Sequence, residues 1–206
     1  MSVYDLIAAG HRGQCFALLG RRFMISEPQA ALAVRHLLPA VFPAFEAWVS
    51  APGGLAAFLD AMNRGGYEQA LSTQSVLTNP FERNRGAQLL EQFRSAREID
   101  GASMAVAVDA SGLSYRVLLH LLPFVVLLMM AGLRLASQTP LREILNRRTG
   151  ARLKPGAYPF AELADLVAWE AKGQRPGDLV SMLDRMFRQR VRSEANQSGP
   201  IAASVA

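Results

Sequence analysis

The sequence predicts an all-α protein, and three observations lead to this prediction. Apolar residues recur at the three- and four-residue spacing of amphipathic helices. Serine, aspartate and proline precede these segments and glycines follow them, as at helix ends. No stretch combines sustained alternation with β-branched residues, which argues against strands. Half of the 206 residues are apolar and 19% are charged, so we expect a packed multihelical bundle rather than a disordered chain.

In the first half, Ser26 is expected to begin a long apolar helix. Its hydroxyl can cap a free backbone N–H, and Gln29 can return the bond in a capping box. Pro39 and Pro43 are expected to bend or break this helix, because proline lacks a donor and clashes with the preceding turn. A shorter helix is predicted over residues 55–62, where apolar residues again recur at helical spacing.

The second half begins near Asn84, where Leu89, Leu90 and Phe93 mark a short helix. Asp100 is expected to cap a further helix, and Ser114 to cap the most apolar helix of the chain. Proline is favoured in the first turn of a helix, so Thr139 and Pro140 predict the start of a separate short helix.

The tetrapeptide His-Leu-Leu-Pro occurs twice in the chain. The first copy is His36, Leu37, Leu38 and Pro39, and the second is His120, Leu121, Leu122 and Pro123. A capping serine precedes each copy, and a short helix is expected to start before it, after Arg12-Gly13 in one case and after Arg85-Gly86 in the other. The spacing from serine to motif differs, so the copies are either a diverged duplication or only analogous. Either way, the motif predicts two proline-kinked core helices that pack their leucines together.

The repeat suggests a division of the chain into four parts. These are a first helical repeat at 1–75, a second at 76–150, a C-terminal helical pair at 151–194 and a flexible tail at 195–206.

Three further segments resemble a known family. They are residues 25–30 leading into 37–39, residues 111–114 leading into 121–123, and the Gly-Gly-Leu at 53–55. Over about residues 10–135 the chain resembles the YidB-like family of bacterial proteins, a domain of unknown function. The resemblance implies an all-α fold and a soluble bacterial protein. It assigns no catalytic residues.

The histidines are the first candidates for chemistry. His36 and His120 could face one another as a metal or proton pair, but neither has an Asp or Glu three or four residues away to support it. His11 and Cys15 share an i, i+4 spacing, yet a zinc site usually needs four ligands. We therefore interpret the histidines as structural and the cysteine as a small buried residue.

A Ser-His-Asp arrangement is the second candidate. Asp109 and Ser111 lie near His120 in the sequence, but the strand-turn-helix setting of a nucleophile elbow is missing. The chain also has no phosphate-binding glycine loop and no His-Glu-x-x-His motif. We therefore expect no enzyme, no cofactor and no metal.

Basic residues are the third candidate, since the formal net charge is +5. Arg185, Arg188 and Arg192 on the last predicted helix form a candidate surface for an anionic partner such as nucleic acid or anionic lipid. The aromatic residues expected between them for single-stranded nucleic acid are absent, which favours a solvated face.

Residues 117–133 carry no formal charge and are bracketed by Arg116 and Arg134. A bilayer core needs about 20 apolar residues, so this run is either a buried core helix or a short membrane span with arginines at the headgroups. The chain shows no secretory signal and has one cysteine, which favours the cytoplasm, with inner-membrane association as the alternative.

Together these observations favour a non-catalytic module that binds a protein partner or associates with itself. Membrane anchoring through residues 117–133 is the first alternative, and nucleic-acid binding through the C-terminal arginines is the second.

Overall fold

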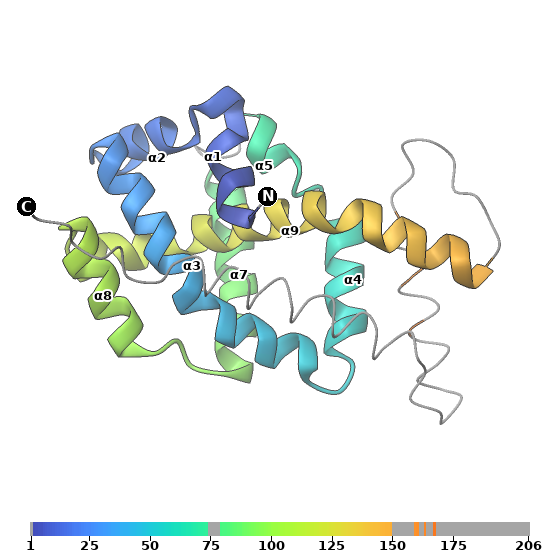
Figure 1. Cartoon of the computed structure of the whole chain (residues 1–206). Coiled ribbons are helices and arrows are strands. Elements are labelled where there is room, and N and C mark those ends of the chain that lie inside the picture. The colour runs from blue at the N-terminus through green and yellow to red at the C-terminus, as the bar shows by residue number, and fades with distance from the viewer. Residues whose placement is uncertain (1, 74–78, 150–158, 161–162, 164–166, 168–206) are drawn as a thin grey trace, which may run out of the picture.

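The computed structural model describes residues 2–73, 79–149, 159–160, 163 and 167. Within them the chain forms eight α-helices and no strand, which confirms the all-α multihelical bundle. In chain order the helices are α1 (Val3–Gly13), α2 (Cys15–Phe23), α3 (Glu27–Ser50), α4 (Gly54–Arg64), α5 (Gln69–Ser72), α7 (Pro80–Ala96), α8 (Gly101–Ser111) and α9 (Tyr115–Thr149), as Figure 1 shows.

The predicted helix starts are confirmed where the capping chemistry is local. The Ser26 hydroxyl accepts a hydrogen bond from the Gln29 N–H at 3.3 Å, and the Gln29 side chain accepts one from the Ser26 N–H at 3.1 Å. Asp100 caps α8 by accepting from the Ala102 N–H. Ser114 accepts from the Val117 N–H at the start of α9. Each cap satisfies a backbone donor that the helix itself leaves free.

The prolines do not break their helices, and the separate helix predicted to start at Thr139 was wrong. α3 continues through Pro39 and Pro43, and α9 continues through Pro123 and Pro140, so no separate helix starts at Thr139. A proline costs a helix one hydrogen bond and some crowding, but burial of the residues on both sides of it holds the helix together. The short helix expected after Arg85-Gly86 starts earlier than expected, because α7 begins at Pro80.

α9 forms the centre of the molecule. In Figure 1 it crosses the whole bundle, and α1, α3, α5, α7 and α8 all pack against it. Every side chain from Phe124 to Ala131 is at most 1% exposed. A single hydrophobic core draws on helices from both predicted repeats, since α3 also packs against α7 and α8. The two predicted repeats therefore share one core.

The prediction for the C-terminal region falls mostly outside the described residues. Phe160, Leu163 and Val167 from the predicted pair at 151–194 are described, and all three are buried in the core. The predicted tail at 195–206 is not among the described residues.

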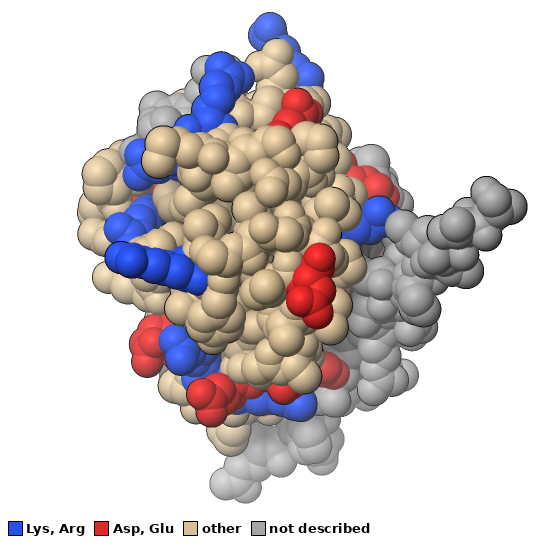
Figure 2. All heavy atoms as spheres, turned by 90° about the vertical axis from the view of Figure 1, so that its left-hand side faces the viewer, with Lys and Arg blue, Asp and Glu red and all other residues tan. Residues whose placement is uncertain are grey.

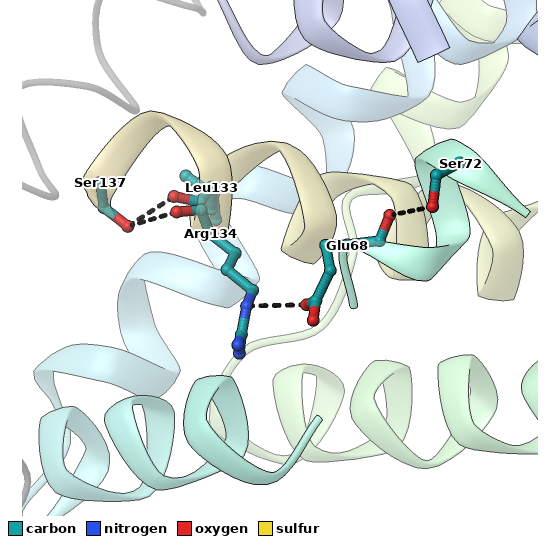
Figure 3. Close-up of polar contacts among 5 residues, drawn as sticks. All are labelled: Glu68, Ser72, Leu133, Arg134 and Ser137. Carbon is teal, nitrogen blue, oxygen red and sulfur yellow. Dashed lines mark hydrogen bonds and ion pairs between the residues drawn. The ribbon is translucent and has the colours of Figure 1, made fainter. Parts of the chain in front are cut away.

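A buried ion pair fixes the far end of the apolar run in α9. The Arg134 side chain is 4% exposed, and its Nε lies 2.8 Å from a Glu68 carboxylate oxygen at the start of α5 (Figure 3). Its guanidinium also stacks over the Phe160 ring, 5.1 Å from the centroid. Ser137, one turn later, donates its hydroxyl hydrogen to the Leu133 carbonyl at 2.6 Å. Arg134 therefore lies inside the protein, whereas Arg116 is exposed.

Two helices among the described residues are long and apolar enough to cross a membrane. They are α3, over Glu27–Ser50, and α9, over Tyr115–Arg147. In the folded chain, 56% of the apolar window of α3 and 78% of that of α9 are buried within the protein. Both helices therefore bury most of this apolar surface against the rest of the chain.

Candidate functional site

The repeated motif contributes to the core, but its two histidines lie in different surroundings. Leu37, Leu38, Leu121 and Leu122 are all buried. His36 is half-buried, and burial lowers the pKa of its imidazole, whereas His120 is exposed. No group of three or more potential metal ligands occurs in the part of the chain that the structure describes. Within the described residues, His36 and His120 therefore belong to no such group of ligands.

The corners that precede the two motifs are alike, although the motifs are offset. Met24 and Gly112 both end a helix in the left-handed conformation, with φ of 54° and 65°. An apolar residue and a capping serine follow in each case. The capping serines are 88 residues apart (114 minus 26), but the motifs are 84 apart (120 minus 36). The motifs therefore lie about one helical turn out of step relative to their corners.

His11 and Cys15 do not share a helix face as their spacing suggested. The backbone leaves helical geometry at His11, where φ is 53°, and α2 starts only at Cys15. The His11 ring is buried and its Nε2 donates to the Ala70 carbonyl at 2.9 Å. Burial raises the pKa of the Cys15 thiol to about 12, so this cysteine is a poor nucleophile and a poor metal ligand at neutral pH.

Ser111 is engaged in shaping the corner between α8 and α9. Its hydroxyl donates to the Ala107 carbonyl at 2.6 Å and accepts from the Leu113 N–H at 3.4 Å. The side chain is buried, whereas Asp109 and His120 are exposed. A serine whose proton is already held by a backbone carbonyl is not poised for attack on a substrate.

The predicted basic surface, Arg185, Arg188 and Arg192, lies outside the described residues. The described part of the molecule shows a different feature on the side where α8 and the corner between α2 and α3 lie. Figure 2 views this side and shows a broad area without charged side chains, with arginines and acidic residues mostly around its margin. This area, which carries few charged side chains, is the candidate functional site.

The helix α8 explains why this area carries few charged side chains. Met104 and Ala107 are buried on its inner side, but Ala105 and Val106 on its outer side are exposed, Val106 to 54%. A surface helix usually has a polar outer side. Asp109 is the one charged residue of α8, so this helix presents apolar atoms to solvent as well as to the core.

The first turns of α9 extend the exposed apolar surface beyond the corner. Tyr115 and Leu119 are one turn apart on one side of the helix and are 53% and 43% exposed. We call the corner face the exposed residues Ala102, Ala105, Val106 and Asp109 of α8 together with Tyr115, Arg116 and Leu119 of α9. The sequence did not reveal this surface, because Val106 and Leu119 carry the same apolar signal as their buried neighbours.

A groove of about 490 Å³ lies between α4 and α7. It is lined by Trp48, Ala57, Asp60, Ala61, Arg64, Gly65, Tyr67, Arg85 and Gln92. Arg64 pairs with Asp60, and Arg85 pairs with Glu82 at 3.1 Å. Because each guanidinium already faces a carboxylate, the groove offers no excess positive charge to an anionic ligand.

Comparisons with known proteins add no identification. No family model, curated protein or solved structure matches this chain. The resemblance to the YidB-like family therefore stays a prediction.

Proposed function

We propose that this protein is a non-catalytic helical interaction module that binds a protein partner, or another copy of itself, through the corner face. The observation that supports the proposal is the outer side of α8, where apolar side chains face solvent on a helix with one charged residue. Contiguous apolar surface of this kind is typical of interfaces, because its exposure to water is unfavourable and burial against a partner removes it.

The remaining candidate chemistry supports a binding role over a catalytic one. The serine, histidine and cysteine that the sequence singled out are buried, bonded to backbone or isolated on the surface. Among the described residues, none of them is paired with the activating partner that nucleophilic or acid–base catalysis needs. We also propose a cytoplasmic location, which a chain with a single cysteine favours.

Site-specific photo-crosslinking in living cells tests the proposal. A photoreactive residue replacing Val106 lies in the corner face, and the same residue replacing the exposed Gln88 on α7 is the matched control. We expect a crosslinked adduct of the full chain with another protein chain from position 106 and none from position 88. Absence of any adduct at position 106 would contradict the proposed function.

Membrane association is the second candidate, favoured by the two helices that are long and apolar enough to span a bilayer. Its test is fractionation without detergent. Recovery of the full chain in the membrane pellet, resistant to a carbonate wash, would support anchoring through α9. Recovery in the supernatant would favour the packed core helix instead.

A further inference from the structure

We infer that the corner face binds a second copy of this chain, in a two-fold symmetric dimer in which Asp109 of each protomer faces Arg116 of the other. The inference rests on the proposed function, because it names the partner of the same surface. The charges and spacing of the residues on that surface support it.

The charge on the corner face is self-complementary. Residues 102–120 contain one acidic residue, Asp109, and one basic residue, Arg116. Both side chains are exposed, and within the described part of the chain neither forms an ion pair. A strongly acidic or basic partner would meet one opposite charge and one like charge here. A second copy offers one opposite charge for each of the two.

The spacing of the residues fits a symmetric pairing. In a two-fold interface, when one residue contacts a second residue of the partner, the reverse contact also forms. Val106 and Asp109 are three residues apart on α8, and Arg116 and Leu119 are three residues apart on α9. Suppose that α8 of one protomer lies antiparallel to the start of α9 in the other. When Asp109 meets Arg116, Val106 then meets Leu119, because three residues span the same rise along both helices.

The symmetric arrangement also accounts for the apolar centre. The pairing would bury Val106 and Leu119, with Tyr115 beside them, and leave the ion pairs at the edge. A desolvated apolar centre with a charged rim is the usual anatomy of a protein interface. The rim pairs would set the register of the two copies, and the apolar contacts would supply most of the affinity.

Charge reversal tests the inference in the full-length protein. Sedimentation velocity over a dilution series gives the dimer dissociation constant of the wild type. We expect Asp109→Arg and Arg116→Asp each to weaken dimerisation by about tenfold, because symmetry replaces two favourable pairs with two like-charge contacts. The Glu143→Arg variant, changed at an exposed position near the other end of α9, is the control and should leave the constant unchanged.

An equimolar mixture of the two reversed variants gives the decisive measurement. In a mixed dimer, the arginine introduced at position 109 of one chain faces the aspartate introduced at position 116 of the other. The unchanged Arg116 of the first chain faces the unchanged Asp109 of the second, so both pairs are opposite in sign. We expect the mixture to dimerise as the wild type does. Circular dichroism and urea unfolding of each variant establish that both remain folded, since both changed positions are exposed.

The outcomes separate this inference from the proposed function. A wild-type chain that stays monomeric at every soluble concentration, or a mixture that fails to recover, overturns the symmetric dimer. If position 106 then crosslinks to a different protein in cells, the proposed function stands without the dimer. If position 106 gives no adduct at all, both are wrong.

Discussion

At the scale of single residues, His11 shows how a candidate for chemistry can be a structural residue. Its backbone adopts a left-handed conformation, which is unfavourable for a residue with a side chain, and its ring is buried. The bond from Nε2 to the Ala70 carbonyl connects the end of α1 to α5. Burial of the ring disfavours its charged form, so the folded protein favours the uncharged imidazole, which still has the proton that this bond needs.

This arrangement predicts that stability falls as pH falls. Burial lowers the pKa of His11 below its usual 6.5, even though the bond to Ala70 opposes this shift. Below pH 6.5 the unfolded chain therefore binds a proton at His11 more readily than the folded chain does. The free energy of unfolding should be constant above this range and decrease as pH falls through it.

Urea unfolding on either side of pH 6.5 measures this effect. The pKa of His36 is also lowered by burial, so the comparison is between His36→Gln and the double variant His11→Gln/His36→Gln. The free energy of unfolding of the single variant should still fall as the pH falls through 6.5. That of the double variant should fall less over the same range. Equal slopes in both would show that His11 does not favour its neutral form in the fold.

At the scale of helices, the crossing of α7 over α9 shows a constraint that only the structure reveals. A Cβ added to Gly86 in α7 would clash with the carbonyl oxygen of Pro123. The two backbones therefore touch at the proline of the second His-Leu-Leu-Pro motif. Arg85 and Gly86 were expected to precede a helix, but they lie inside α7. The close approach of the two backbones requires a glycine at position 86.

We expect Gly86→Ala to destabilise the protein despite the better helix propensity of alanine. The added methyl must push α7 away from a rigid backbone segment, and such overpacking costs about 1–3 kcal/mol. Gly101→Ala is the matched control, since nothing lies within 4 Å of its added Cβ. That change should be neutral or stabilise by about 0.4–1 kcal/mol, because alanine restricts the unfolded chain. Similar urea midpoints for the two variants would contradict the close crossing.

The helices also show what the sequence could and could not predict. The caps at Ser26, Asp100 and Ser114 depend on a few neighbouring residues, so their positions were correct. The continuity of α9 through Pro140 depends on its packing against the rest of the bundle, so it was not predictable from local rules. The corner face was missed for a related reason. In α8 the apolar residues surround the helix, so periodicity cannot separate the buried Met104 from the exposed Val106.

At the scale of the whole molecule, the surroundings of α9 are the main question that the sequence left open. By composition, residues 117–133 suit a protein core or, as the alternative, a short membrane span. In the fold, five other helices supply the apolar surroundings, and Glu68 supplies a carboxylate to Arg134 at the end of the run. As a membrane span, the same helix would place Arg134 among lipid headgroups and would have no need of Glu68.

The packed fold predicts that Glu68→Gln destabilises the protein. In the packed fold this change removes the charge that balances a buried guanidinium. We expect a loss of about 1–3 kcal/mol in the free energy of unfolding, below the roughly 3–5 kcal/mol of a fully buried pair, because the Glu68 side chain is 31% exposed.

The double variant Glu68→Gln/Arg134→Met isolates the pair from its surroundings. Methionine fills much of the same volume without a charge, so the double variant should recover most of the stability that Glu68→Gln loses. Urea unfolding of the wild type, both single variants and the double variant forms a cycle whose coupling energy we expect to be at least about 1 kcal/mol. A coupling near zero would mean that Arg134 and Glu68 do not meet in the protein, as expected if α9 leaves the bundle for a membrane.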